Sequence, residues 1–345
     1  MAKIKVGIIN VTGYAGVELA RLLHGHPKVQ LASVTGRSAA GQPLGDVFPH
    51  LADLDLTITD ELANVDFAFS ALPHKASAVA VAQAMGRGIK VVDISADFRF
   101  RDSAMYGKWY GFEHPAPDLL NEAVYGLPEL HRSEIASTRL VANPGCYPTS
   151  AVLALAPAVK AGLVGPDIIV DSKSGISGSG RTTSLTTHFA EADESVAAYS
   201  LDGHRHLPEI VQELEKLGGK APAVTFVPHL VPMTRGILST CYATLLSGKL
   251  PAGEKGVKEL KGIYQHFYSK EPFVRVVSAP PQSKHTWGSN FCLVFPTIDM
   301  RTGRLIVVSC LDNLVKGAAG QAIQNMNLML GLPETLGLES LPLYP

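Results

Sequence analysis

The order of hydrophobic and polar positions divides the chain into two parts with different patterns. In the first part, apolar runs alternate with segments of helical spacing at residues 16–23 and 75–87. Apolar runs without alternation are typical of strands buried on both faces of a sheet, and intervening helices fit the crossovers of a parallel sheet. Strands are predicted at residues 4–9, 29–35, 66–72, 91–95 and 140–142. We therefore expect an α/β domain built on a doubly wound parallel sheet.

Beyond residue 146 the pattern changes. An Ala- and Leu-rich helix is predicted at residues 150–161, and then several strands follow with few helices between them. These strands are predicted at residues 168–171, 224–228, 236–246, 274–277, 291–297 and 304–311. Such a succession favours an α+β domain with a mixed or antiparallel sheet and helices on one face. A last amphipathic helix is predicted at residues 313–330.

Composition narrows the class of protein. The 345 residues, 46% of them hydrophobic, suffice for two packed domains, and a net charge of −1 gives no field that favours nucleic acid or an anionic membrane. We find no membrane-spanning apolar window and no signal or transit peptide pattern, so we expect a cytoplasmic protein. The four cysteines are far apart, which favours reduced thiols over a disulfide framework or a zinc site. They are Cys146, Cys241, Cys292 and Cys310.

A glycine-containing turn joins the first strand to the first helix. Glycines there let a pyrophosphate approach the helix N-terminus, where N–H groups and the helix dipole favour anions. The candidate cofactor-binding residues are Thr12, Gly13, Tyr14, Ala15 and Gly16. Asn10 stands where the usual pattern has its first glycine, but Asn tolerates a left-handed backbone, so the turn can survive. The alternative is an ordinary strand–helix turn.

The residues after the second strand indicate which dinucleotide would bind. An NAD site usually has an acidic residue there to hold the ribose hydroxyls, and this chain has Arg37 and Ser38 instead. A guanidinium and a hydroxyl suit a 2′-phosphate, so NADP is favoured over NAD. The alternative is a solvated surface arginine.

Further candidates follow other strands. Leu72 and Pro73, and Ser95 with Arg99, come after strands of the first domain, at the sheet edge where ligands bind in open α/β folds. The Gly- and Ser-rich residues 174–181, including Ser177 and Gly178, are rich in donors that suit a phosphate. A disordered linker is the alternative for that segment.

Cys146 has a setting that the other cysteines lack. A strand, a tight turn at residues 143–145 and a helix place its thiol at a helix N-terminus. That position lowers the pKa of a thiol and supplies backbone N–H groups for an oxyanion. Cys241, Cys292 and Cys310 lie within apolar runs and are predicted to be core residues.

A cluster at residues 202–209 combines imidazole, guanidinium and carboxylate groups. If a helix begins there, with Pro208 in its first turn, Glu209 can meet His206 and orient it as an acid/base. A metal site built on His204 and His206 is an alternative, although no third ligand stands out and Arg205 would repel a cation. A plain surface loop is the other alternative.

Taken together, these motifs resemble the N-acetyl-gamma-glutamyl-phosphate reductases, a family within the semialdehyde dehydrogenase superfamily. The resemblance covers essentially the whole chain, and the cysteine and histidine motifs in this order are its most specific part. It rests on residues 12–16, 71–74, 93–99, 141–149, 173–181, 204–209 and 312–318.

The resemblance implies a domain layout and residue roles. Residues 1–146 would form an NADP-binding Rossmann domain and residues 147–312 a substrate domain that carries homodimer or homotetramer contacts, with residues 313–345 returning to the first domain. Cys146 would be the nucleophile, His206 the acid/base, and Asn313 would lie near the nicotinamide. Arg99, Asn143, His204 and Arg205 are the substrate-binding candidates, of which Arg99, His204 and Arg205 are expected to act as cations.

The implied reaction is the NADPH-dependent reduction of N-acetyl-gamma-glutamyl phosphate to the 5-semialdehyde, through a thioester, in arginine biosynthesis. No metal is expected. A related reductase for aspartyl or carrier-linked aminoadipyl phosphate would share this chemistry. A non-catalytic NADP sensor would need neither Cys146 nor His206, and a Rossmann-type methyltransferase would lack the cysteine turn.

Overall fold

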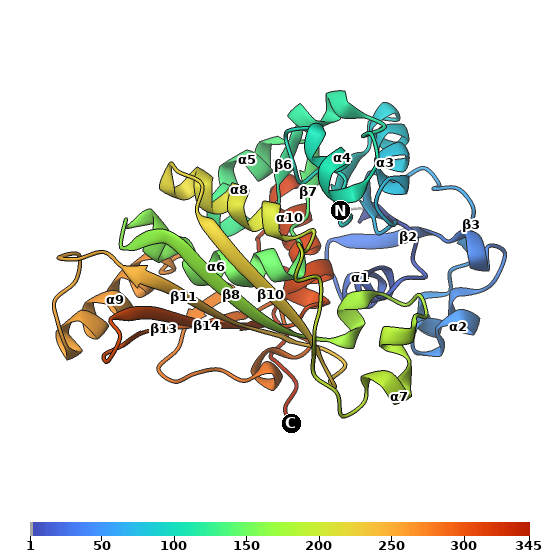
Figure 1. The fold of residues 1–345 in the computed structure, drawn as a ribbon. Helices are drawn as coiled ribbons and strands as arrows, with labels where there is room; N and C mark the ends of the chain where they lie inside the picture. Colours follow the sequence, from blue (N-terminus) through green and yellow to red (C-terminus); the bar gives the residue numbers. More distant parts are fainter. Residues whose placement is uncertain (1–2) are drawn as a thin grey trace. The chain divides into compact units, whose positions relative to one another are not determined.

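The computed structural model describes residues 3–345, which form two compact units (Figure 1). The first runs through Pro144 and resumes at Ala318–Ser340, and the second comprises Gly145–Gly317 with Leu341–Pro345. The change from one unit to the other falls between residues 144 and 145, and residues 313–317 stay with the second unit. Cys146 is therefore part of the second unit.

The first unit is built on a seven-stranded sheet in the order β3-β2-β1-β4-β5-β7-β6. Every pairing in it is parallel, which confirms the predicted doubly wound α/β fold. The strands are β1 (Ile4–Ile9), β2 (Val29–Thr35), β3 (Ile58–Thr59), β4 (Phe67–Ser70), β5 (Lys90–Asp93), β6 (Ala123–Tyr125) and β7 (Leu140–Ala142). The strand order reverses between β1 and β4, and ligands bind at the carboxyl edge beside such a point.

Helices cover this sheet, and the last of them comes from the end of the chain. They are α1 (Tyr14–His24), α2 (Leu44–Val47), α3 (Ala76–Gly86), α4 (Ala104–Tyr110), α5 (Pro128–Ser137) and α10 (Gly320–Met329), with short 3₁₀ turns at Arg37–Ala39, Pro49–Leu54 and Pro117–Asn121. Helix α10 packs on α1, α5 and β5. Its Asn325 Nδ2 donates to the Gly126 carbonyl at 2.8 Å, and Lys90 Nζ donates to the carbonyl of Met329 at 2.8 Å. These bonds tie a distant segment into the first unit.

The second unit contains a mixed seven-stranded sheet in the order β12-β13-β14-β11-β8-β10-β9. The β8–β10 and β12–β13 pairs are parallel and the others are antiparallel, as a mixed sheet requires. The strands are β8 (Val164–Gly175), β9 (Ala197–Ala198), β10 (Ala223–Val231), β11 (Ile237–Leu245), β12 (Val274–Val276), β13 (Cys292–Asp299) and β14 (Arg304–Leu311).

Within the described chain, three helices pack on the second sheet and bury alternate residues of its strands. They are α6 (Cys146–Lys160), α8 (Leu207–Gly218) and α9 (Glu254–Phe267). The unit also has the short exposed helix α7 (Phe189–Ala192) and 3₁₀ turns at Ile176–Ser179, Leu185–Thr187 and Ser283–Thr286. Helix α6 packs on β11, β13 and β14, while α9 packs on β13 and α8 on β10 (Figure 1). In β11, Ser239 and Cys241 are buried, whereas Leu238 and Tyr242 stay half-exposed. Across residues 3–345, no helix combines the length and apolarity needed to cross a bilayer.

Several elements differ from the sequence predictions, and two of them bear on the site. The strand predicted at 168–171 continues to Gly175 because β10 and β11 pair with it on both sides. The helix predicted at 313–330 is instead a π-helical turn, Val315–Ala319, followed by α10. The Asp312 carboxylate Oδ1 accepts the N–H groups of Leu314 and Val315, so the helical segment begins at Val315 rather than at Asn313.

Candidate active site

Cys146 begins helix α6, directly after the extended N-cap residue Gly145. Its side chain is partly exposed, whereas the other three cysteines are buried, which confirms that Cys241, Cys292 and Cys310 are core residues. The first turn of α6 offers the backbone N–H groups of Cys146 and Tyr147. Pro148 has no N–H group.

The residues on either side of Cys146 contact the histidine cluster. The N–H of Gly145 donates to Glu209 Oε1 at 2.7 Å, and Glu209 is fully buried. The ring of Tyr147 lies edge-on to the His206 ring, with centroids 6.0 Å apart. Helices α6 and α8 pack together. The fold thus brings the two motifs that carry the candidate chemistry to one place in the second unit.

Helix α8 begins where the sequence predicted a helix. His206 is its N-cap and Pro208 lies in its first turn, together with Glu209. The N–H of His206 donates to His204 Nδ1 at 3.0 Å. Because one oxygen of Glu209 accepts the Gly145 N–H, this carboxylate links the start of α8 to the cysteine turn. Its orienting role toward His206 stays a prediction.

The surroundings of His204 oppose the expectation that it acts as a cation. Burial, and then the positive charge of Arg205, lower the pKa of His204 to about 4, so its imidazole is neutral near pH 7. Its ring packs against Tyr147, Tyr199 and Phe226 at centroid distances of 5.7, 5.6 and 5.4 Å. Arg205 is exposed, which leaves it as a cationic candidate in this cluster. Within residues 3–345, no group of three or more His, Cys, Asp or Glu side chains forms a metal site.

Two tyrosines belong to this cluster, and the sequence did not single them out. Tyr199 Oη donates to Tyr147 Oη at 3.2 Å. Burial raises the pKa of Tyr147 well above its usual value and that of Tyr199 to about 12, so both hydroxyls are neutral at physiological pH. Tyr147 is adjacent to Cys146, which was a usable signal. Tyr199 lies in a segment without periodicity.

Three predicted cofactor-binding residues lie together in the second unit. Asn313 Nδ2 donates to Ser177 Oγ at 2.9 Å, and Asn313 Oδ1 accepts the N–H of Gly236 at 2.7 Å. Gly178 is close by, because a Cβ placed on it would lie 3.7 Å from Asn313 Nδ2. The amide of Asn313 is therefore held in a fixed orientation.

The glycine-containing turn of the first unit is formed with Asn10 in the left-handed region, at φ 70°. Its Nδ2 donates to the Ala71 carbonyl at 2.9 Å, and its Oδ1 accepts from Thr12 Oγ1 at 3.0 Å. A Cβ on Gly16 would lie 2.5 Å from the Asn10 carbonyl oxygen, so only glycine permits this close approach. The expectation that the turn survives with Asn10 is confirmed.

A pocket of about 970 Å³ adjoins this turn in the first unit. Arg37, Ser38, Leu72 and Asn10 line it. So do four polar residues from neighbouring segments that the sequence did not indicate: Asp60, Glu61, Gln83 and Arg87.

The turn beside this pocket and the start of α1 are formed by the predicted residues Thr12, Gly13, Tyr14 and Ala15. Pro73 follows the lining residue Leu72. Residues 12–16 do not line the pocket themselves, but a pocket of this volume with an arginine beside the β1–α1 turn fits a dinucleotide.

Ser95, Asn143 and Arg99 make structural contacts that the sequence did not predict. The Ser95 hydroxyl donates to Asp93 Oδ2 at 2.7 Å and accepts the Asp97 N–H at 3.1 Å. Asn143 is fully buried, with Nδ2 donating to the Ala318 carbonyl and Oδ1 accepting from Asn325. These bonds give both side chains a structural role, and the direct ligand roles expected for Ser95 and Asn143 stay predictions.

Arg99 is also largely buried. Its Nε donates to the carbonyl of Asn143 and its Nη2 to that of Ile94, both at 2.9 Å. The guanidinium therefore holds the ends of β5 and β7 together. A further role toward substrate stays a prediction.

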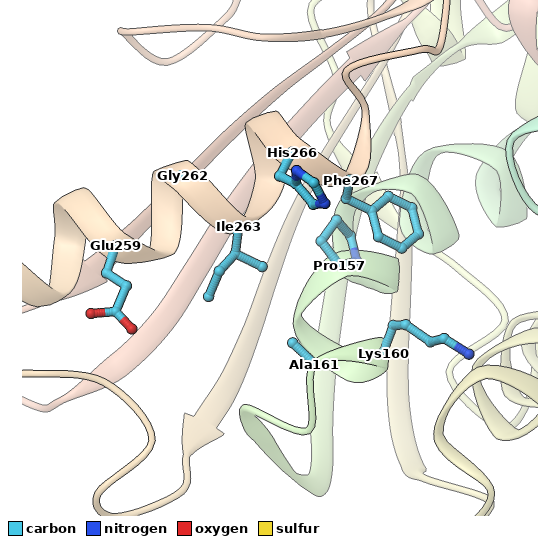
Figure 2. Close-up of a pocket in the computed structure, with 8 residues that line it drawn as sticks. All are labelled: Pro157, Lys160, Ala161, Glu259, Gly262, Ile263, His266 and Phe267. Atoms are coloured by element: carbon cyan, nitrogen blue, oxygen red, sulfur yellow. The ribbon is translucent and has the colours of Figure 1, made fainter.

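A second hollow, of about 510 Å³, lies between α6 and α9 (Figure 2). Pro157, Ala161, Ile263 and Phe267 contribute most of its apolar lining, and the charged Lys160 and Glu259 stand at separate points around it (Figure 2). Cys146, His206 and Asn313 do not line it. It has no converging polar groups and is unsuited to the candidate chemistry.

Comparisons with known protein families match both units. A sequence model described as the semialdehyde dehydrogenase NAD binding domain matches residues 5–138, and one described as the semialdehyde dehydrogenase dimerisation domain matches residues 146–313. The class of protein defined by fold and site is therefore that of the two-domain semialdehyde dehydrogenases.

The curated relatives are more specific. A protein of Dehalococcoides mccartyi named N-acetyl-gamma-glutamyl-phosphate reductase is 60% identical over 100% of both chains. One of the same name from Citrifermentans bemidjiense is 51% identical over 99% of this chain and 100% of its own. The chain belongs to the family of N-acetyl-gamma-glutamyl-phosphate reductases.

Solved structures agree on the fold. The aspartate semialdehyde dehydrogenase II of Vibrio cholerae, complexed with ASA, has a TM-score of 0.71 at 16% identity over 96% of this chain and 99% of its own. The Candida albicans aspartate semialdehyde dehydrogenase with NADP has the same TM-score and identity over 95% and 99%. At this identity the likeness shows the fold alone.

Proposed function

We propose that this chain reduces N-acetyl-gamma-glutamyl phosphate to N-acetyl-glutamate 5-semialdehyde and phosphate, as a step of arginine biosynthesis in the cytoplasm. The single observation that carries the proposal is the hydrogen bond from the Gly145 N–H to Glu209, which joins the cysteine turn to the histidine cluster. The names of the full-length relatives support the substrate.

We infer that the first unit holds the 2′-phosphate and pyrophosphate of NADP, and that the second unit holds the substrate. Arg37 and Ser38, after β2, line the pocket where a 2′-phosphate would be held. Thr12, Gly13, Tyr14, Ala15 and Gly16 would hold the pyrophosphate at the start of α1. Asn313, Ser177 and Gly178 would hold the nicotinamide end. NADPH supplies the hydride when it is bound.

In the first half of the reaction, the Cys146 thiolate attacks the acyl carbon of the substrate. A sulfur–carbon bond forms, the carbon–oxygen bond to phosphate breaks, and phosphate leaves. The N–H groups of Cys146 and Tyr147 can stabilise the oxyanion of this step. The product on the protein is a thioester at Cys146.

In the second half, the thioester carbon gains a hydride and the sulfur–carbon bond breaks, which releases the aldehyde and restores the thiolate. His206 donates a proton to the developing oxygen and takes it back when the sulfur–carbon bond breaks and the aldehyde carbonyl forms, and its place beside Tyr147 suits that role. Arg205, exposed next to His206, is the candidate ligand for a substrate anion.

The decisive variant is Cys146→Ser. We expect loss of NADPH-dependent reduction by at least about 10³-fold, because the alcohol is a far weaker nucleophile, with NADPH binding near that of the natural chain. The phosphate-dependent reverse reaction, with N-acetyl-glutamate semialdehyde and NADP, is measured in parallel. Cys310→Ser is the matched control, because that buried sulfur contacts Thr286 and the Gln282 carbonyl, and it should retain activity.

Full activity in Cys146→Ser would remove the thioester. A panel of aspartyl, aminoadipyl and N-acetyl-glutamyl phosphates, each with NADPH and NADH, separates the related reductases and the two cofactors. Preference for an aspartyl or carrier-linked substrate would overturn the substrate proposed here.

The apolar face of the second sheet supports a homodimer or homotetramer. Tyr242 and Ile306 pair across β11 and β14, and Phe295 pairs with Val308 across β13 and β14. All four are half-exposed, on the strand positions that alternate with the buried ones. Oligomer interfaces are enriched in such apolar and aromatic surfaces. The matched dimerisation domain covers these strands.

A further inference from the structure

The π-helical turn Val315–Ala319 passes unusually close to the start of α6. A Cβ placed on Gly317 would lie 2.8 Å from the Cβ of Cys146 and 3.3 Å from its Cα. Real Cβ contacts are essentially never shorter than 3.0 Å. The backbone of Gly317 therefore rests against Cys146 at a distance that no other residue type would allow.

This close contact is fixed on both sides. On one side, α6 is anchored because Gly145 N–H donates to Glu209 and Ser150 Oγ donates to Ser239 Oγ. On the other side, the N–H of Gly317 donates to the carbonyl of Asp312 at 2.9 Å. Neither partner can move away freely, so an added methyl group must displace Cys146 or the turn.

The same segment carries Asn313. Asp312 Oδ2 accepts the N–H of Gly288 at 2.8 Å, and Asn313 is held by Gly236 and Ser177. Gly317, which contacts Cys146, thus follows Asn313 by only four positions in the sequence. One rigid segment bears both the group proposed to hold the nicotinamide and the surface against which the nucleophile is packed.

We propose that Gly317 is a positioning residue, and that the turn from Asp312 to Gly317 sets the place of Cys146 relative to Asn313. The catalytic part of this proposal rests on the proposed function. The contact between Gly317 and Cys146 does not depend on it. A displacement of about 1 Å at a reacting atom can cost about 10²-fold in rate. The absence of a side chain at residue 317 therefore has a functional reason.

The test is Gly317→Ala, with Gly262→Ala as the matched control. Gly262 lies in α9 of the same unit, and a Cβ there meets no neighbouring atom within 4 Å. We expect Gly317→Ala to lower kcat by about 10- to 100-fold, while KM for the acyl phosphate and for NADPH changes by less than about threefold. The control should match the natural chain in both constants.

A second readout does not depend on reductase activity. The rate at which iodoacetamide alkylates Cys146, followed by peptide mass spectrometry over pH 6–9, reports the surroundings of the thiol alone. We expect the rate profile to change in Gly317→Ala and not in Gly262→Ala. If the natural chain proved not to be a reductase, this profile would still test the positioning.

A second variant covers the case in which Gly317→Ala does not fold, as judged by thermal unfolding. Asp312→Asn adds no heavy atom, but its Nδ2 cannot accept the Gly288 N–H and its amide cannot pair with Arg235, so the variant loosens the turn. It should also lower kcat and change the alkylation profile. Unchanged kcat and an unchanged profile in the folded variant or variants would overturn the proposal.

Discussion

Asp93, in the first unit, shows how burial shifts the pKa of a carboxyl group. Asp93 is fully buried at the end of β5, where the Ser77 and Ser95 hydroxyls donate to its carboxylate at 2.5 and 2.7 Å. Desolvation nevertheless raises the pKa of Asp93 to about 6, because burial penalises the charged form more than these bonds stabilise it. The neighbouring Asp97, whose pKa is also raised by burial, adds to the shift in Asp93.

This predicts a pH dependence of stability. Between the pKa of an unfolded Asp, about 4, and about 6, the folded chain binds a proton at Asp93 that the unfolded chain does not. The contribution of Asp93 to the free energy of unfolding is therefore largest at low pH and falls as pH rises through 6. We expect a loss of about 1 kcal/mol between pH 5 and 7.

Urea unfolding of the natural chain and of Asp93→Asn at pH 5, 6 and 7 measures this term. The difference between the two chains cancels the other groups that titrate in this range, including His26 and His114, whose pKa values burial lowers. A difference that stays constant with pH would contradict the prediction.

At the same scale, the sequence predicted backbone conformation better than it predicted the charge of side chains. Asn10 was expected to adopt a left-handed conformation because its residue type tolerates one, and it does. The charge of His204 depended on Tyr147, Tyr199 and Phe226, which surround it from other parts of the chain. Only the folded chain shows such burial.

At the scale of elements, buried serines hold α6 on its sheet. Ser150 from α6 hydrogen-bonds to Ser239 of β11 and Ser309 of β14, at 2.9 and 2.7 Å, and Ser239 is 2.7 Å from Ser172 of β8. All four side chains are fully buried. Since α6 begins with Cys146, this network also fixes the helix that presents the nucleophile.

Removing the Ser239 hydroxyl, which lies at the centre of this network, should lower the stability of the chain. Ser239→Ala leaves the Ser172 and Ser150 hydroxyls each short of one partner in the core, so we expect a loss of about 1–3 kcal/mol in the free energy of unfolding by urea. Ser269→Ala is the control: that exposed hydroxyl bonds only locally, to the His266 carbonyl, and the variant should change stability by less than about 0.5 kcal/mol.

The double variant Ser172→Ala with Ser239→Ala separates a network effect from simple truncation. It should lose less than the sum of the two single variants, because it removes both partners of one bond. Strict additivity would show that the two hydroxyls act independently.

Element types were predictable where the pattern was long and periodic. The strands at 4–9, 29–35 and 304–311 lie where the sequence placed them. The extension of β8 depends on its two pairing neighbours, β10 and β11. The π-helical turn depends on the Asp312 carboxylate, which accepts two backbone N–H groups at its start. Neither cause is visible as periodicity.

At the scale of the whole molecule, the half-exposed apolar face of the second sheet predicts self-association. Tyr242→Asp would place a charge in the centre of that face, which we expect to weaken the proposed homodimer by at least about tenfold. Sedimentation equilibrium at micromolar concentration measures the mass. Tyr344→Asp, at an exposed residue outside the sheet, is the control and should leave the mass unchanged.

A natural chain that sediments as a monomer at every concentration would contradict this prediction. A Tyr242→Asp variant with the oligomeric mass of the natural chain would place the interface elsewhere.

The first unit is built from two pieces of chain, because α10 supplies a buried wall against α5 and β5. During synthesis, the strands of the second sheet have all been translated by residue 311, before α10 exists. The nucleotide-binding half, although translated first, waits for residues 320–329 before its core can close. A ribosome that stalls shortly before residue 320 would therefore release a chain whose N-terminal half stays open to proteases.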